Sequence, residues 1–171
     1  MGLYPLTVNT PPEDPAHIYA EDDAAIYEAI VGGDGVYDIG DKMKATVIDN
    51  NTVRVSNGVL SVGGHLARIK YGDYQDMVID NGGSGKNRND LIVANFSTTG
   101  PRGVDTYTIK VLKGVPVTGK AADPAVADGN LYEGATERDL PLYRVRLEGI
   151  SIVAVDSLYS LKEPMGVLQG S

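Results

Sequence analysis

The stretch from Asp80 to Asp90, DNGGSGKNRND, contains the residue types of a phosphate-binding loop. Backbone N–H groups of glycines can surround a phosphate, and a lysine can add positive charge. A P-loop requires glycine at position 80 and a serine or threonine after Lys86, but this chain has Asp80 and Asn87 there. The loop also leads into a predicted strand rather than a helix, so we predict neither a nucleotide nor another cofactor here.

Ser84 stands between two glycines, which raises the question of a hydrolase nucleophile. The nucleophile elbow Gly-x-Ser-x-Gly needs glycine two residues after the serine, and that residue is Lys86. The chain has two histidines, His17 beside a proline-rich segment and His65 at the start of a predicted strand. We interpret both as surface or packing residues rather than as catalytic bases.

Two short acidic clusters offer carboxylates that could bind a hard cation or act in hydrolysis. They are Asp34, Asp38 and Asp41, and Asp73, Asp76 and Asp80. Neither cluster has the alternating ligand steps around a glycine that define a calcium loop. We interpret them as solvated turn acids and predict no metal site, no catalytic residues and no enzyme. A hydrolase that uses two carboxylates distant in sequence stays open as a third hypothesis.

We interpret the glycine-rich loop itself as an architectural turn. Its structural residues are Gly82, Gly83, Gly85, Asn87, Arg88 and Asp90. Glycines allow positive φ without steric cost, and Asn87 and Asn89 are expected to bond their own backbone. Arg88 and Asp90 stand two apart in a strand, so their side chains share one face. We expect Asp90 to accept backbone N–H groups and Arg88 to reach a carboxylate or carbonyl across the sheet.

Length and composition favour one globular domain with many turns. The chain has 171 residues, of which 42% are hydrophobic, and it contains 21 glycines, 9 prolines and no cysteine. Its net charge of −8 repels nucleic-acid phosphates and anionic membranes, so we predict neither as a partner. The N-terminal residues lack the basic and apolar regions of a secretory signal.

One segment has a helical pattern. In EDDAAIYEAIVGG, acids occupy the first turn, where the helix dipole favours them. Gly32 and Gly33 are expected to end the helix. Its buried face is predicted from the apolar residues at helical spacing, which are Ala25, Ile26, Ala29 and Ile30.

From the end of this helix to about residue 113 the hydrophobic period changes to two, which predicts strands. Asn57-Gly58 predicts a tight hairpin, and the run Leu91 to Ala94, apolar at every position, predicts a central strand. The fold class that follows is mainly β: an antiparallel sandwich or partly closed barrel of about eight to ten strands with one short α-helix.

The predicted domain organisation is simple. Residues 1–16 form an extended N-terminal arm or a loose terminus, residues 17–160 a single β-rich domain, and residues 161–171 a C-terminal exit segment. Residues 114–138 form a long connection with one helical turn expected near DPAVADG. Long connections in compact domains are commonly functional or fixed at an interface.

Three stretches carry a family resemblance when taken together: the helix and glycines from Glu21 to Gly35, NNTVRVSNGVLSVGGHLARI, and GKNRNDLIVA. They resemble tail or baseplate structural proteins of phages and prophages of Gram-positive bacteria, over roughly residues 15–160. In that family such a domain sits at the N-terminal end of a fibre or receptor-binding protein, or forms a small virion component. The resemblance implies a place and a role, not a chemistry.

The resulting hypothesis is a non-enzymatic structural protein of a phage tail or baseplate, acting in virion assembly and in host attachment. It would be synthesised in the bacterial cytoplasm and located in the virion. Its partners would be other tail proteins and copies of itself, with a trimer expected through the N-terminal arm or residues 114–138. The alternative is a carbohydrate-binding module for a cell-wall glycan, which needs a concave face with several tyrosines and amides.

Overall fold

The computed structural model describes residues 2–5 and 19–163. The helices are α1 (Ala20–Val31) and the 3₁₀ helix η1 (Leu131–Glu133). The strands are β1 (Leu3–Pro5), β2 (Gly35–Tyr37), β3 (Ala45–Asp49), β4 (Thr52–Val62), β5 (His65–Val78), β6 (Asn87–Thr98), β7 (Asp105–Leu112), β8 (Glu137–Glu148), β9 (Ser151–Ser157) and β10 (Leu161–Lys162). His17, most of the predicted arm and most of the predicted exit segment lie outside the described residues.

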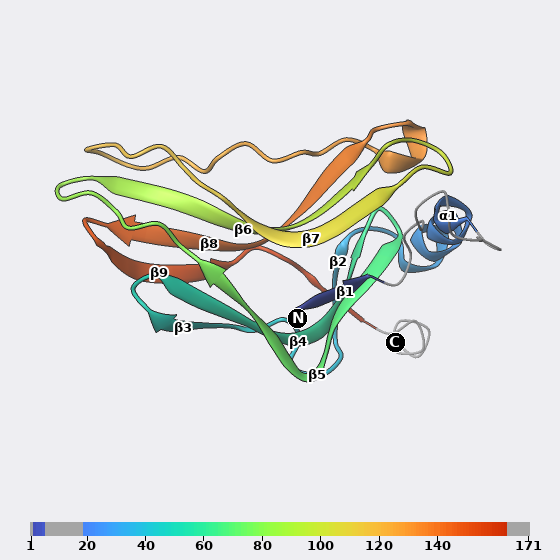
Figure 1. The fold of residues 1–171 in the computed structure, drawn as a ribbon, viewed down its shortest axis with the longest axis horizontal. Coiled ribbons are helices and arrows are strands. Elements are labelled where there is room, and N and C mark those ends of the chain that lie inside the picture. The colour runs from blue at the N-terminus through green and yellow to red at the C-terminus, as the bar shows by residue number, and fades with distance from the viewer. Residues whose placement is uncertain (1, 6–18, 164–171) are drawn as a thin grey trace.

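The strands form two sheets that pack face to face (Figure 1). Sheet A has six strands in the order β1-β5-β4-β2-β10, with β3 also paired to β4. Sheet B has four strands in the order β7-β6-β8-β9. The pairs are antiparallel except for β2 with β10, which is parallel. One of the two sheets curls into a half-barrel, so the predicted mainly β class, a sandwich or partly closed barrel with one short α-helix, is confirmed.

The core lies between the two sheets and follows the period of two of the strands. In β4, Val53, Val55 and Leu60 are fully buried, and in β6 the inward side chains include Ile92 and Phe96. Apolar residues from both sheets therefore form a single cluster.

β6 is buried on both faces, and its central place in sheet B was predicted. Ile92 and Ala94 belong to the cluster between the sheets. Leu91 and Val93 alternate with them, so they face outward, yet they are only 3% and 0% exposed. Something other than sheet A must cover them.

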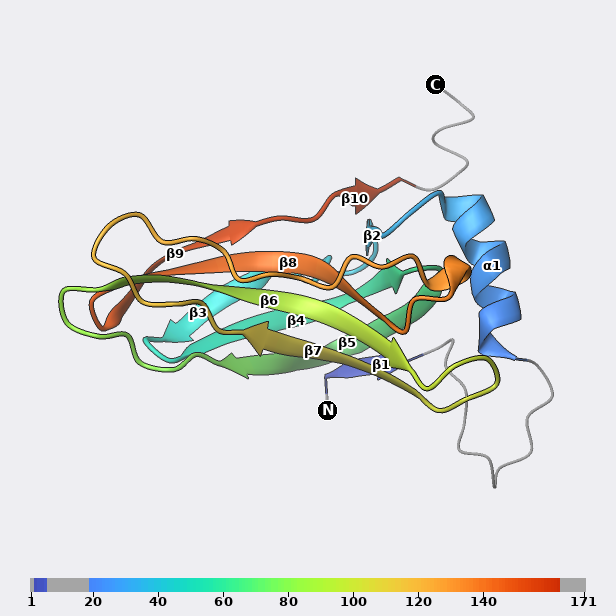
Figure 2. The same ribbon diagram turned by 90° about the horizontal axis from the view of Figure 1, so that it is seen from above.

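That cover is supplied by residues 114–130, which we call the strap. The strap crosses the outer face of sheet B, from the side of β7 to the side of β9 (Figures 1 and 2). Isolated backbone bridges hold it near both ends, Val117 with Asn87 and Asp128 with Arg138. The helical turn expected near residues 123–129 is wrong, because the short helix of this connection is η1, further along the chain.

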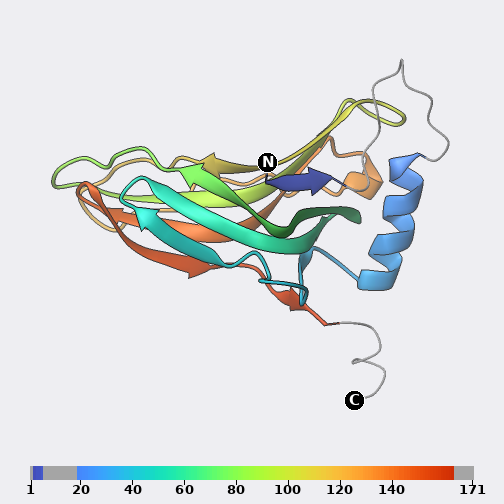
Figure 3. The same cartoon turned by 60° about the horizontal axis from the view of Figure 1, so that its bottom comes forward.

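α1 lies across one end of the sandwich (Figures 2 and 3). Acids occupy its first turn, and Gly32 ends it with a φ of 80°, as the sequence predicted. Among the described residues, no helix is long and apolar enough to cross a membrane.

The face by which α1 packs differs from the predicted one. Its buried residues are Ala20 and Ala24, whereas the expected stripe was Ala25, Ile26, Ala29 and Ile30. The two isoleucines of that stripe are 57% and 51% exposed. The cause is a close approach, because a Cβ on Gly64 would overlap the carbonyl oxygen of Ala24. Only small side chains fit between a helix and a turn at that separation.

The hairpin predicted at Asn57-Gly58 is also wrong. β4 runs through both residues with a register shift and turns at Gly63-Gly64, whose φ values are 56° and 82°. Asn57 is buried, and its amide bonds Asp41, accepting from the backbone N–H at 3.1 Å and donating to the carboxylate at 2.8 Å. The asparagine therefore fixes a neighbouring loop instead of making a turn.

Replacing Gly64 by alanine tests how α1 is held. Gly64 and Gly72 have nearly the same φ, 82° and 85°, so alanine costs about 1–2 kcal/mol at either position. A Cβ at Gly72 meets nothing within 4 Å, whereas one at Gly64 meets Ala24. We expect Gly64→Ala to lose about 1–3 kcal/mol more than Gly72→Ala in urea unfolding. Equal losses of stability would show that α1 can move away from the added Cβ without destabilising the fold.

Candidate functional site

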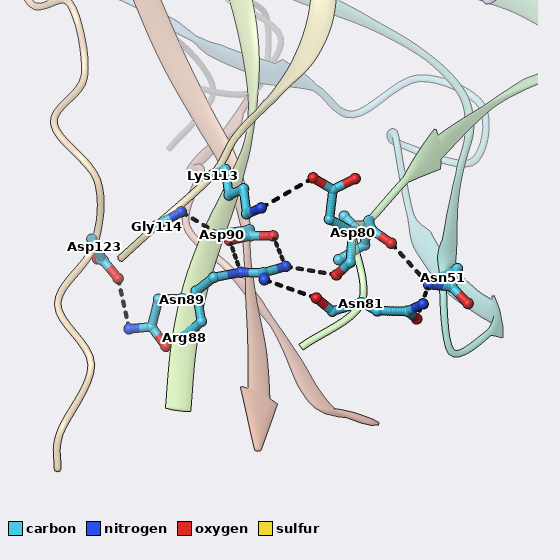
Figure 4. Close-up of polar contacts among 10 residues, drawn as sticks. Asn51, Asp80, Asn81, Arg88, Asn89, Asp90, Lys113, Gly114 and Asp123 are labelled. Atoms are coloured by element: carbon cyan, nitrogen blue, oxygen red, sulfur yellow. Dashed lines mark hydrogen bonds and ion pairs between the residues drawn. The ribbon is translucent and has the colours of Figure 1, made fainter. Parts of the chain in front are cut away.

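The glycine-rich loop and the start of β6 contain a buried ion pair, Arg88 with Asp90 (Figure 4). Their side chains are 4% and 1% exposed. Arg88 Nε donates to Asp90 Oδ1 at 2.8 Å and Nη2 donates to Oδ2 at 2.9 Å. This two-point contact is the strongest geometry available to these groups.

Backbone groups make further hydrogen bonds to the polar atoms of the two charged side chains. Arg88 Nη1 donates to the carbonyl of Asn81 at 3.2 Å, and Nη2 donates to that of Asp80 at 2.7 Å. Asp90 Oδ1 accepts the backbone N–H of Gly114 at 2.9 Å, so the aspartate also holds the first residue of the strap. Burying charges is tolerated when every group is matched in this way.

The same cluster reaches sheet A. Asn51, in the turn between β3 and β4, donates to the Asn81 side chain at 2.6 Å and to the Ile79 carbonyl at 3.1 Å. Lys113 Nζ lies 3.2 Å from Asp80 Oδ2 (Figure 4). The loop between β5 and β6, which joins the two sheets along the chain, is thus also fastened to both by side chains.

The two asparagines of the loop act differently from our expectation. Asn87 Nδ2 donates to the carbonyl of Gly119 at 2.8 Å, and Asn89 Nδ2 donates to the carbonyl of Ala121 at 3.3 Å. Asn89 also donates to Asp123 Oδ1 at 3.0 Å. Instead of bonding their own backbone, both amides hold the strap. In an antiparallel strand alternate side chains face outward, and the strap lies on that outward face.

The three glycines predicted for the turn have three different environments. Gly85 takes a φ of 72°, as expected, and has open space around it. A Cβ on Gly82 would overlap the carbonyl oxygen of Gly149 in the β8–β9 turn. Gly83 has neither a positive φ nor a close neighbour, since the nearest atoms belong to Lys86 at 3.8 Å. Positive φ explains one glycine and close approach explains another.

The groups that suggested catalysis do not come together. Ser84 and Lys86 are exposed in the loop that follows β5, whereas His65 begins that strand, which is 14 residues long. His65 is buried and stacks on Phe96 with ring centroids 3.9 Å apart, which fits the packing interpretation.

The acidic clusters are engaged in internal contacts. Asp34 accepts from Gly63 N at 2.8 Å and from Arg138 Nε at 2.7 Å, so it is not a solvated turn acid. In the second cluster, Asp76 pairs with Arg54 on the neighbouring strand at 2.7 Å. Within the described ranges, no group of three or more metal-ligating side chains is arranged to hold an ion.

A cavity of about 450 Å³ lies between α1, the β6–β7 turn and η1. No sequence motif predicted it, because its walls come from segments far apart in the chain. Phe96 and His65 line its buried part, and acids of α1, Glu21, Asp22 and Glu28, line it on the helix side. Among the described lining residues Tyr132 is the single tyrosine and no amide side chain occurs. The cavity therefore lacks the several tyrosines and amides expected of a carbohydrate-binding face.

Comparison with known proteins does not assign a family. No family model matches this chain, and no curated protein matches it. Its function is therefore inferred from the residues and the fold.

Breaking the buried pair tests whether the loop is architectural. Asp90→Ala should lower the free energy of unfolding by about 3–5 kcal/mol, because Arg88 stays buried without its counter-charge. Lys86→Ala should change it by less than about 0.5 kcal/mol, since the residue is exposed. Chemical denaturation of both variants measures the contrast. Similar small effects would mean that the cluster is ordinary surface.

The strap should loosen in acid. The Arg144 guanidinium, helped by Asn89, holds the pKa of Asp123 below its ordinary value. The contribution of Asp123 to the stability of the folded chain is therefore fully present above the unfolded pKa of about 3.9, and it is lost as the pH falls through the lower pKa of the folded state. The pair is one-third exposed, so about 1 kcal/mol or less is at stake. The protection factors of strap amides, which compare their exchange rates with those of an unstructured chain at the same pH, should fall below about pH 4, and Asp123→Asn should show low protection at every pH.

A matched variant controls for general loss of charge. Asp128→Asn changes another strap carboxylate, at a bridge held through main-chain atoms, and should leave strap exchange near that of the parent chain. If both variants accelerate exchange equally, the Asp123 contacts with Arg144 and Asn89 are not what fastens the strap.

Proposed function

We propose that this protein is a non-enzymatic structural component of a phage tail or baseplate. The observation that carries the proposal is the use of polar residues: the loop that could have been catalytic binds the strap, the sheets and itself. Fastening of this kind suits a rigid assembly part. The resemblance of three sequence stretches to phage tail proteins supplies the context, with the virion as the location.

Assembly with copies of itself and with other tail proteins is part of this proposal. A β domain that assembles needs surfaces on which apolar side chains remain exposed. Residues 114–138, one of the two expected self-contacts, expose Val115 and Tyr132 at 73% and 76%. A homotrimer through this segment is the arrangement expected from the sequence.

Glycan binding is the second candidate. The cavity beside α1 has one tyrosine and no amide, fewer than the face expected from the sequence, but its carboxylates and that tyrosine are groups that contact sugars. Carboxylates accept hydrogen bonds from sugar hydroxyls, and an exposed aromatic ring can stack on a sugar face. Asp22, Glu28 and the exposed ring of Tyr132 supply both groups around one hollow of about 450 Å³. Host attachment would then be a role of this end of the molecule.

The virion role can be tested in particles. Antibodies raised against the chain should label the tail or baseplate when phage particles from the bacterium that carries the gene are viewed by electron microscopy. Particle proteins separated from free protein on a density gradient should contain the chain. Finding it only in the free fraction would contradict the proposal.

A glycan array tests the second candidate. Binding through the cavity requires that Tyr132→Ala weakens retention by about tenfold, the loss of one stacking contact. Tyr71→Ala is the matched control, because Tyr71 is 90% exposed on β5 and does not line the cavity. Equal effects of the two variants would exclude the cavity. Release of soluble fragments from purified cell walls would instead support a hydrolase.

A further inference from the structure

Sheet B ends in an edge strand that has only part of the usual protection. β9, Ser151–Ser157, pairs with β8 on one side, and no described strand pairs with its other side. Its sequence, SIVAVDS, contains neither lysine nor proline, two residues that natural edges use against strand pairing. The strand does have a β-bulge at Val153, where its pairing with β8 shifts register. It is rich in β-branched residues, which favour a sheet.

The opposite edge of sheet B is closed against sheet A. Near β7, Gln75 of β5 donates to the carbonyl of Ile109 at 3.4 Å. The hydroxyl of Tyr107 on β7 donates to the carbonyl of His65 at 2.7 Å. These contacts join the sheets near β7. On the β9 side the two sheets are joined beyond the strand itself, where the Tyr159 hydroxyl donates to the carbonyl of Lys42 at 2.9 Å.

The β9 side leaves apolar side chains uncovered. Ile152 and Val155 pack against the core but remain partly exposed, and Val153 is 49% exposed. The views agree that β3 lies along the same side (Figures 1, 2 and 3). Val47 and Ile48 of β3 are each 46% exposed. A strand added beside β9 would cover half-buried core residues and satisfy its free backbone groups.

We propose that the strand added there is β9 of a second copy, antiparallel about a two-fold axis. With the two-fold axis at Ala154, that residue faces its own copy, and Val155 to Ser157 face Ser151 to Val153, where the bulge interrupts regular pairing. No like charges stand opposite each other, which is the condition for stable cross-strand pairs.

The charge of β9 is already neutralised within each copy. Its single charged residue, Asp156, pairs with Arg146 at 2.9 Å and lies 3.9 Å from Arg144. The net charge of −8 on each chain therefore causes little repulsion between two copies at this contact, because the charge nearest to it is neutralised and the more distant charges are screened by salt. The self-complementary pattern favours a second copy over an acidic or basic partner segment.

The contact would merge two copies of sheet B into one continuous sheet, with four strands from each copy. A two-fold contact uses up both edges, so it closes at two copies. It differs from the trimer expected through residues 114–138 in the number of copies and in the segment that makes the contact. It does not depend on a virion role, because it requires only the open edge.

The mass of the full chain in solution tests the contact. Light scattering should give twice the chain mass of 18.1 kDa for the unmodified protein. Val153→Lys, which places a charge on the edge without removing a core residue, should restore 18.1 kDa. Val115→Lys makes the same change on the strap, at 73% exposure, and should leave the dimer intact. Melting curves verify that both variants fold.

Cross-linking tests the register directly. The chain has no cysteine, so Ala154→Cys introduces a single thiol that should form a disulfide-linked dimer under mild oxidation. Glu148→Cys, on β8 and away from the edge, should remain monomeric in a denaturing gel. A monomer at high concentration, a trimer that Val153→Lys leaves unchanged, or dissociation by Val115→Lys alone would each overturn the proposal.

Discussion

A guanidinium and a carboxylate buried in a β-sandwich cost several kcal/mol each unless their hydrogen-bonding groups are matched. Arg88 and Asp90 are matched by one another and by main-chain groups from two further segments, the loop at Asp80 and the strap at Gly114. Three stretches of chain must therefore meet at one point. An arrangement of the chain that places the loop or the strap elsewhere leaves a buried charged group without one of its hydrogen-bond partners. Such an arrangement is therefore less stable than the observed one.

The course of the strap follows from this constraint. Gly114 must bring its N–H to Asp90, and a Cβ there would overlap the carbonyl oxygen of Asn89, so only glycine fits. From that point the outward amides of β6 hold the strap over the outer face of sheet B. The strap explains why Leu91 to Ala94 is apolar on both faces in an antiparallel sheet, where one face is commonly solvated.

Local signals predicted the fold class, the central strand and the limits of the helix, because each depends on neighbours in the sequence. The wrong predictions depend on distant partners. The buried face of α1 is decided by the approach of Gly64, and Asn57-Gly58 is held in β4 by a contact with Asp41. Asn89 illustrates the same limit, since nothing in the loop indicates that its partner is Asp123. The cavity beside α1 has walls from several such segments and had no signal in the sequence.

The features that remain available for recognition are surfaces rather than motifs. Strand pairing uses main-chain groups that every residue except proline carries, so a pairing edge needs no particular side chains. What distinguishes such an edge is the absence of protecting residues, together with a side-chain pattern that opposes no like charges. These properties become visible only when the sheet order is known, because the same residues in a central strand would carry no information. A search for catalytic residue patterns therefore passes over β9, even though its sequence contains all that pairing requires.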